Sequence, residues 1–466
     1  MDRSATSLLR SINRRAFLQG SGALAGVSAL GLSGCAHPAH PASRTSAMAG
    51  TVPALTPPLP LYDQYTPLVP IRAHADRIFR ITVCLRPFRA AGPRMDVEKL
   101  GDKTIVHNYG HGGSGWSLSW GSATIATQSA MTAAEGSQDI AVLGAGAIGL
   151  TSATMLQRAG AHVTIYAKER APFTRSSRAT GSWTPDSRVA LASAVAPSFA
   201  ATWESMARAS FFMYQSFYGM PGSPIEWTDR WGLSDAPRGQ FGAQAGGAAG
   251  AAGAAGAAPA AGAAPGGRRA RAAGAAGPAG AGGAAGGPAH DFIRLTPRIA
   301  DLTPRPIVMP PGSTPFPTPY VTRSSSMTFN VADYSRQLLT DFLIAGGKIE
   351  TREFHSPQEL TELPQKVIVN CPGYGGRALW SDESITPVRG QIAWLIPQED
   401  AIYGLSYKGL SVLSRRDGIV MQYSGGQGEE QGWNDTNEAP DRANAEESVG
   451  VLAELYSRMA TMKQKG

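Results

Sequence analysis

A cluster of glycines near the middle of the chain has the spacing that a phosphate-binding turn requires. The segment 144–149 follows the apolar run 139–143, and a helix-compatible stretch then extends to Gly160. In such a unit the first glycine permits a tight turn, the second lets the backbone approach a pyrophosphate, and the third lets the helix pack on the strand. The phosphates meet the positive end of the helix dipole. The predicted dinucleotide-binding residues of the turn are Gly144, Gly146, Ala147, Ile148 and Gly149.

An acidic residue stands where such a unit binds a ribose. Glu169 follows the second apolar run, 161–166, and a carboxylate at the end of this strand can accept hydrogen bonds from ribose hydroxyls. A solvated glutamate between Lys168 and Arg170 is the alternative interpretation, and the sequence leaves both open. The turn indicates an adenine dinucleotide, but it does not distinguish FAD from NAD.

A second glycine-rich segment carries the residues that distinguish FAD from NAD. Residues 107–121 combine the run 112–115 with two histidines and two tryptophans, which a glycine-rich surface turn would not explain. The segment resembles the HNYGHGG block of the D-amino-acid oxidase family of FAD enzymes. Four further segments also resemble that family. Residues 85–89 resemble its arginine strand, residues 369–373 its NCTG motif, residues 387–392 its RGQI motif and residues 402–407 its paired tyrosines.

This resemblance implies FAD as the cofactor and a substrate-binding role for Arg86. A planar guanidinium can form two parallel hydrogen bonds to a substrate carboxylate and so fix the direction of the Cα hydrogen. In this family the hydrogen passes as hydride to the flavin, and the protein orients the substrate and excludes water. Bare backbone at residues 112–115 would approach the flavin with its amides directed at the ring. A surface ion pair is the alternative for Arg86.

The resemblance also assigns residues around the flavin and the substrate. Tyr407 and Tyr403 would bind the substrate carboxylate or close the pocket, and half-buried packing residues are the alternative. The predicted catalytic residues are Arg86, Tyr407, Tyr403 and Gly113. The predicted cofactor-binding residues outside the glycine turn are Lys168, Glu169, Ser176, Ser177, Gly112, Gly113, Ser114, Gly115, Trp116 and Ser117.

The order of these segments differs from that of the family. There the arginine strand and the HNYGHGG block come last, whereas here they precede the glycine turn, and the chain ends in a helix-like stretch, residues 444–462. This order indicates a circular permutation. We expect the new ends to lie close together in space, because the termini of compact domains are often neighbours.

Composition places the chain among globular proteins with two domains. Its 466 residues are 42% hydrophobic and 17% charged. We expect an α/β fold in which a Rossmann-type FAD-binding domain is joined to a substrate domain with a mixed or antiparallel sheet. The excess of Lys and Arg over Asp and Glu, 42 to 35, is too small to indicate nucleic-acid binding. Cys84 and Cys371 lie in apolar runs without metal-ligand spacing, so we expect buried, unpaired cysteines and no metal site.

The first residues resemble an export signal. Arg14 and Arg15 precede a glycine-softened apolar run that ends at Cys35, which is typical of a twin-arginine signal with a lipoprotein cleavage site. An ordinary secretory signal or an uncleaved anchor is the alternative. The predicted parts of the chain are a signal peptide (1–34), a flexible tether (35–68), a segment with the substrate arginine and the flavin loop (69–136), the FAD-binding core (137–241), a disordered Ala/Gly-rich insertion (242–290) and the remainder of both domains (291–466).

Together these features predict an FAD-dependent oxidase of D-amino acids that is exported to the bacterial periplasm or cell envelope. A lipid on Cys35 would anchor it to the membrane. The product would be an imino acid that hydrolyses to a 2-oxo acid and ammonia, with hydrogen peroxide formed from oxygen. A dehydrogenase that passes electrons to a quinone and an inactive flavin-binding envelope protein are the alternatives. An NAD-dependent enzyme would not explain residues 107–113. The sequence leaves a homodimer open.

Overall fold

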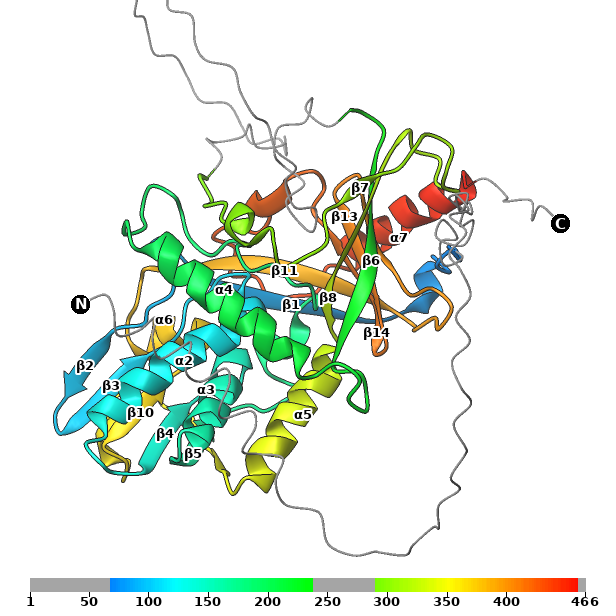
Figure 1. The fold of residues 1–466 in the computed structure, drawn as a ribbon. Coiled ribbons are helices and arrows are strands. Elements are labelled where there is room, and N and C mark those ends of the chain that lie inside the picture. Colours follow the sequence, from blue (N-terminus) through cyan, green and yellow to red (C-terminus); the bar gives the residue numbers. More distant parts are fainter. Residues whose placement is uncertain (1–67, 238–289, 460–466) are drawn as a thin grey trace, which may run out of the picture. The chain divides into compact units, whose positions relative to one another are not determined.

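The computed structural model describes residues 68–237 and 290–459, which contain two β-sheets and the helices packed on them (Figure 1). The predicted signal peptide lies outside the described residues, and so do the predicted tether and insertion except for their last residues. The two sheets confirm the predicted mixed α/β fold class. Within the described ranges, no helix has the length and apolar character needed to cross a bilayer.

A six-stranded sheet carries the predicted dinucleotide-binding unit. Its strand order is β2-β3-β10-β4-β5-β9, and all neighbours are parallel except β2 and β3. The central strands are almost entirely buried, because helices and loops cover both faces of a parallel sheet. The strands are β2 (Val97–Leu100), β3 (Lys103–His107), β4 (Asp139–Leu143), β5 (His162–Ala167), β9 (Lys348–Thr351) and β10 (Val367–Asn370).

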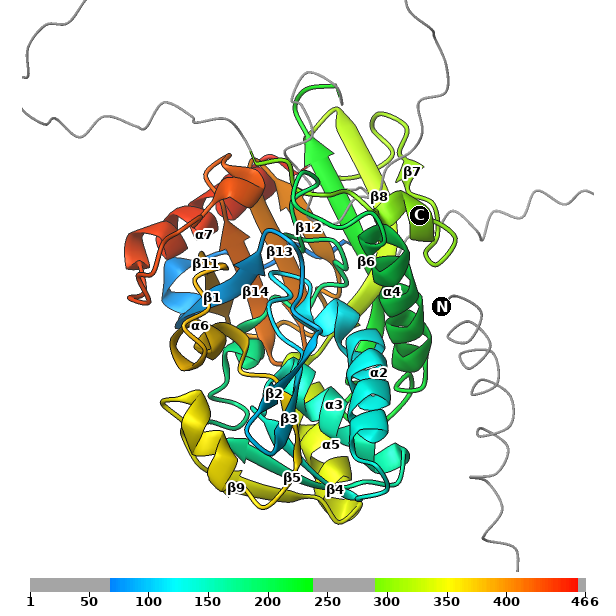
Figure 2. The ribbon, with the colours of Figure 1, turned by 90° about the vertical axis from the view of Figure 1, so that its left-hand side faces the viewer.

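Four helices share one buried hydrophobic core beside this sheet, and Figure 2 shows how they are arranged. They are α2 (Gly115–Ala133), α3 (Ala147–Arg158), α4 (Phe199–Gln215) and α5 (Val331–Ile344). Helix α3 packs between α2 and α5, and α4 packs on α2. Trp120 of α2 donates its indole N–H to the hydroxyl of Tyr334 of α5 over 2.7 Å, and both side chains are fully buried. This hydrogen bond satisfies the one polar atom of Trp120 inside an aromatic core.

An eight-stranded sheet forms the second half of the described structure. Its strand order is β1-β11-β14-β13-β12-β6-β8-β7, and only β12 and β6 are parallel. Helix α7 (Arg442–Ser457) packs on one face of this sheet. The strands are β1 (Ile78–Arg89), β6 (Ile225–Ser234), β7 (Ile307–Val308), β8 (Tyr320–Phe329), β11 (Ile385–Leu395), β12 (Gly404–Tyr407), β13 (Leu410–Arg415) and β14 (Gly418–Tyr423).

The segment that precedes the glycine turn contributes to both sheets. Strand β1 pairs with β11 over nearly its whole length, and β3 lies between β2 and β10. Residues far apart in the sequence are therefore neighbours in both sheets. The remaining short helices are α6 (Gly376–Leu379) and the 3-10 helices η1 (Ala75–Arg77), η2 (Arg175–Arg178), η3 (Thr296–Ile299), η4 (Pro357–Glu362), η5 (Gly373–Gly375) and η6 (Gly428–Glu430).

Replacing Tyr334 with Phe tests the aromatic core. The variant keeps the ring but leaves the buried N–H of Trp120 without its acceptor. We expect the free energy of unfolding to fall by about 1–3 kcal/mol, the usual cost of an unsatisfied buried donor. Chemical denaturation measures this difference. Tyr320→Phe on β8, where the side chain is exposed, is the matched control and should change little; equal stability of the two variants would contradict the prediction.

Candidate active site

A cavity of about 800 Å³ is lined by residues from both sheets. Strands β1 and β11 supply one wall. The turns and loops that follow β3, β4, β5 and β10 supply the other, together with η2. Because β3, β4, β5 and β10 are parallel neighbours, their carboxyl ends meet at one edge of the sheet, where open α/β sheets bind their ligands.

The glycine turn has the tight backbone that its spacing predicts. Gly144 has a φ of 92°, and a Cβ there would lie 2.5 Å from the carbonyl oxygen of Cys371. Gly144, Gly146, Ala147 and Ile148 line the cavity, whereas Gly149 packs behind the turn. The Ala147 N–H, in the first turn of α3, donates to Ser176 Oγ over 2.9 Å. The start of α3 thus offers its amides to an acceptor at the cavity wall.

The predicted ribose residues also line the cavity. Glu169 is half-buried and makes no ion pair or hydrogen bond with any described residue, so both its carboxylate oxygens are available to ribose hydroxyls. Lys168, beside it, pairs with Glu353 at 2.9 Å. Glu169 thus lies where the ligand role requires it, and that role stays a prediction.

The HNYGHGG loop lies at the cavity wall, but its amides do not point as expected. Gly112 donates its N–H to Pro87 O at 2.9 Å, and Gly113 donates to Ser187 O at 3.1 Å. The prediction that these two amides face the flavin ring is therefore wrong, because the protein's own backbone uses them. Gly112, Gly113, Gly115 and Trp116 line the cavity, while Ser114 and Ser117 do not and bond instead to residues of the segment 184–187.

His111 presents a buried lone pair at the same wall. Ser122 donates its hydroxyl proton to Asn108 Oδ1, so it accepts from His111 Nε2, which lies 2.8 Å away. This chain fixes the neutral tautomer and leaves Nδ1 as an acceptor, buried and without a partner among the described residues. Burial lowers the pKa of His111 to about 3, so the ring is neutral at physiological pH. A ligand that brings an N–H donor would satisfy Nδ1.

Arg86 places a positive charge in the cavity without an ion-paired carboxylate among the described residues. Its guanidinium donates to Arg389 O at 3.3 Å and forms no ion pair with any carboxylate in the described part of the chain. Burial lowers its pKa, and the nearby Glu429 opposes this shift. Arg86 lines the cavity together with the glycine turn and the HNYGHGG loop. The alternative of a surface ion pair is thus wrong, and the remaining donors of the guanidinium fit an anionic ligand.

The two predicted active-site tyrosines lie elsewhere. Tyr403 donates to Val69 O at 2.8 Å and contacts Tyr456 of α7, while Tyr407 donates to Asp235 at 2.9 Å. Neither lines the cavity. Both belong to the core between the eight-stranded sheet and α7, on the face of the sheet opposite to Arg86. The prediction that these tyrosines lie in the substrate pocket is therefore wrong. The alternative, that they are packing residues, is correct.

Other residues line the cavity that were absent from the prediction. Arg175 and Arg178 of η2 lie around Ser176 and pair with Glu438 at 2.5 and 3.8 Å. In the sequence, these two arginines flank the serine pair that was predicted to bind the cofactor, and this position was the signal for them. Ser177 does not line the cavity, because its hydroxyl bonds to Thr174. Cys84 and Cys371 are unpaired as expected, but both line the cavity, and burial raises the pKa of each thiol.

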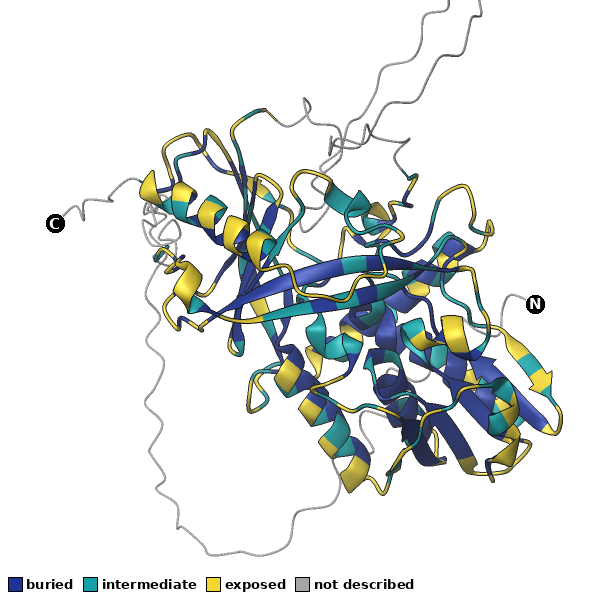
Figure 3. Cartoon of the chain, turned by 180° about the vertical axis from the view of Figure 1, so that it is seen from behind, coloured by how far each residue is buried: buried dark blue, intermediate teal, exposed yellow. Residues whose placement is uncertain are grey.

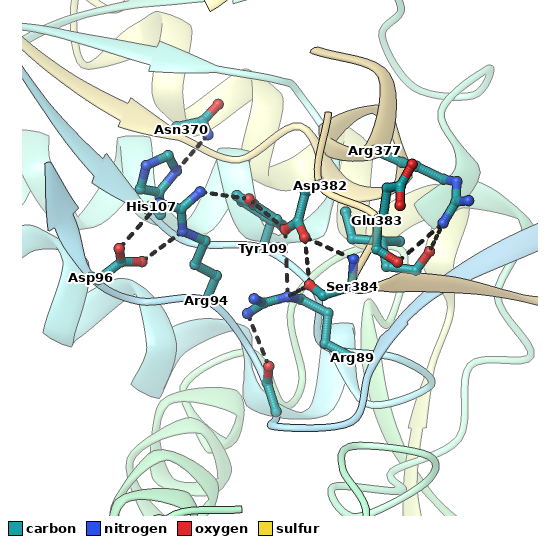
Figure 4. A network of polar contacts seen from close by, with 12 residues as sticks. Arg89, Arg94, Asp96, His107, Tyr109, Asn370, Arg377, Asp382, Glu383 and Ser384 are labelled. Carbon is teal, nitrogen blue, oxygen red and sulfur yellow. Dashed lines mark hydrogen bonds and ion pairs between the residues drawn. The ribbon is translucent and has the colours of Figure 1, made fainter. Parts of the chain in front are cut away.

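A polar network braces the HNYGHGG loop (Figure 4). The Tyr109 hydroxyl donates to Asp382 at 2.9 Å and accepts from Arg94, and burial raises the pKa of Tyr109 to about 12. Arg94 also pairs with Asp96 and Glu98, which lie near His107. Asp96, Glu98 and His107 could group around a cation, but the guanidinium of Arg94 already pairs with both carboxylates.

The chain matches a known family over most of its length. Residues 139–463 match the DAO family model, described as FAD dependent oxidoreductase. Arg86 and the HNYGHGG loop lie outside this range, although they line the same cavity as the glycine turn within it.

Three curated relatives match parts of the chain. D-amino-acid oxidase of Rubrobacter xylanophilus is 35% identical over 134 residues, 27% of this chain and 38% of the relative. D-amino acid oxidase of Dugesia ryukyuensis is 32% identical over 106 residues (22% and 30%), and D-amino-acid oxidase of Fusarium vanettenii is 51% identical over 47 residues (10% and 13%). The chain thus spans at most 38% of the length of these relatives. A solved structure, L-amino acid deaminase from Proteus vulgaris, aligns with a TM-score of 0.37 and 11% identity over 62% of this chain and 60% of its own.

Replacing Gly144 with Ala should weaken dinucleotide binding. A Cβ at a φ of 92° is strained and would press on the Cys371 carbonyl, so the turn must shift. We expect the affinity for FAD to fall about tenfold to a hundredfold, as a strain of about 1–3 kcal/mol predicts. Flavin absorbance per protein after dialysis measures retention. Gly450→Ala on the open surface of α7 should retain full FAD, and full retention in both variants would refute this role of the turn.

His111 should make the protein sensitive to acid. Its folded pKa of about 3 lies below the unfolded value near 6.5, so the unfolded state binds more protons between these values, and stability falls as pH drops through that window. His111→Asn removes this contribution. The destabilisation that it causes at neutral pH should therefore shrink as the pH falls from about 6.5 towards 4, measured by denaturation at each pH. Exposed His162→Asn is the control; a constant gap for His111→Asn would disprove the assignment.

Proposed function

Because the chain belongs to the DAO family of FAD dependent oxidoreductases, we propose that it oxidises a D-amino acid at the bond between Cα and the amino nitrogen. The observation that carries this proposal is the uncompensated guanidinium of Arg86 in the same cavity as the glycine turn. A protein that only binds FAD has no need of a second cation-bearing site in addition to its phosphate-binding turn. An amino-acid substrate always brings the carboxylate that this cation lacks.

The residues of the cavity fit FAD. The start of α3 with Ser176 would hold the pyrophosphate, and Glu169 would accept from the ribose hydroxyls. Gly112, Gly113, Gly115 and Trp116 would lie against the ring system, and Nδ1 of His111, which has no partner among the described residues, suits a ring that carries an N–H donor. When bound, FAD supplies the acceptor for the hydride of the substrate.

The protein's part in the reaction is placement. Arg86 would hold the carboxylate through two parallel hydrogen bonds and thereby fix the Cα–H direction. His111 is neutral and both cavity thiols are protonated, so these groups supply no strong base, and none is needed when hydrogen leaves as hydride. The imino product would hydrolyse to a 2-oxo acid and ammonia. Oxygen as acceptor would yield hydrogen peroxide, whereas a quinone acceptor would make the protein a dehydrogenase.

We also propose that the family's segments are circularly permuted in this chain. The family match begins at residue 139, yet the arginine strand and the HNYGHGG loop before it complete the cavity. Ile71, near the start of the described residues, and Leu452 of α7 belong to the same core, which agrees with ends that lie together. A twin-arginine signal and a lipid on Cys35 remain proposals from the sequence, and they would place the enzyme in the bacterial envelope.

Anaerobic reduction of the purified protein tests the function. A panel of D- and L-amino acids, glycine and N-methyl amino acids is added without air, and bleaching of the flavin absorbance by D-amino acids is expected. Bleaching by L-amino acids alone would refute the stereochemical assignment. Failure of every amino acid to bleach the flavin would refute the enzymatic proposal. Reoxidation by air or by a soluble quinone then identifies the electron acceptor.

Arg86→Ala tests the carboxylate-binding role. Loss of the charged hydrogen bonds should weaken substrate binding by about 1.5–3 kcal/mol, a tenfold to hundredfold rise in KM, with the FAD content unchanged. Arg80→Ala is the matched control, since Arg80 lies on the same strand but is exposed and outside the cavity. Unchanged KM in the Arg86 variant would remove this residue from the site.

A further inference from the structure

The pairing of β1 with β11 places a glycine directly beside the guanidinium of Arg86. Cys84 pairs with Gly390, and Arg86 pairs with Val388 two residues along. Partners in an antiparallel pair project from the same face of the sheet. Cys84, Arg86, Gly390 and Ile392 accordingly all line the cavity.

The space that a side chain at position 390 would fill is taken by the guanidinium. A Cβ on Gly390 would lie 2.3 Å from both Nη1 and Nη2 of Arg86 and 2.5 Å from Cζ, and these are its three nearest atoms. The flat group therefore lies directly over the backbone of Gly390. Its Nη1 donates to the carbonyl oxygen of the preceding residue, Arg389, at 3.3 Å.

Backbone conformation does not require glycine at this position. Gly390 has no left-handed φ, and it lies inside a regular strand whose pairing with β1 continues on both sides. Its neighbours on the same face, Val388 and Ile392, are β-branched. Gly390 thus leaves an open space between two bulky side chains, and the Arg86 guanidinium occupies this space.

We propose that Gly390 is a positioning residue that sets the place of the Arg86 guanidinium and, through it, the place of the substrate carboxylate. This proposal rests on the proposed amino-acid oxidase function. A methyl group at position 390 pushes the end of a flexible side chain, so the sheet itself has no need to move. Contact distances between heavy atoms of about 3.5 Å require the guanidinium to retreat by about 1 Å. A misplacement of this size can lower a rate about a hundredfold.

Gly390→Ala tests the proposal in four proteins: wild type, Gly390→Ala, Arg86→Lys and the double variant. Benzoate, a carboxylate that cannot be oxidised, is titrated while the flavin absorbance is followed, and KM and kcat are measured with the best D-amino acid. We expect Gly390→Ala to keep its FAD content and unfolding midpoint. Its affinity for benzoate should fall about tenfold to a hundredfold and its KM should rise in parallel.

The double variant separates positioning from a general effect on the sheet. Lysine keeps the charge but lacks the atoms that a Cβ at position 390 would meet, so Gly390→Ala should have little further effect in the Arg86→Lys background. An equal loss of benzoate affinity in both backgrounds would overturn the proposal, and so would wild-type affinity in the single variant. Gly450→Ala is the control for a glycine-to-alanine change outside the cavity.

Benzoate binding also keeps the two proposals apart. If the wild type binds benzoate but no amino acid bleaches the flavin, the oxidase function fails, while the benzoate affinities still decide the role of Gly390. If the wild type is reduced by D-amino acids and Gly390→Ala behaves like the wild type, only the positioning role is refuted.

Discussion

The site depends on a half-buried positive charge that forms no ion pair with a described carboxylate. Withdrawing a cation from water without an ion-pair partner costs free energy, and a chain selected for stability alone would place an acid or an apolar residue there. The long pairing of β1 with β11 keeps Arg86 in this position, with α7 packed on the other face of the sheet. The burial pattern in Figure 3 shows β1 and β11 largely buried or half-buried along this pairing. Stability elsewhere in the fold thus offsets a local cost that the chemistry requires.

The side chains of β11 alternate between the cavity and the core beneath α7. Gly390 and Ile392 face the cavity, while Ala393 and Leu395 belong to the core beneath α7, and Gln391 donates to Asp441 at the start of that helix. A strand of period two can serve both faces only if its register is fixed. The cavity face of β11 carries Gly390 between Val388 and Ile392, whereas the opposite face carries Ala393 and Leu395, which pack in the core beneath α7.

The sequence predicted those parts of the site whose chemistry is local. The glycine turn, its helix and Glu169 follow one another in the chain, so spacing alone placed them, and resemblance added Arg86. Tyr403 and Tyr407 were misplaced because alternation shows that they share a face with Leu405 but not which face meets α7. The amides of Gly112 and Gly113 were misjudged because their acceptors, Pro87 and Ser187, come from distant segments. Such partners are decided by tertiary packing, which no local pattern records.

Segment order matters less to this site than strand register. The cavity needs β1 beside β11 and β3 beside β10, and both pairings join residues that are remote in the chain. A cut and rejoining outside the strands would leave these pairings intact, which is the physical reason that the proposed permutation is compatible with the fold. A slip of one residue between β1 and β11 is a different matter, because it would turn Arg86 to the α7 face and away from the cavity. The site therefore depends on the register of this strand pair, because the open space at Gly390 lies beside the Arg86 guanidinium only at this alignment of the two strands.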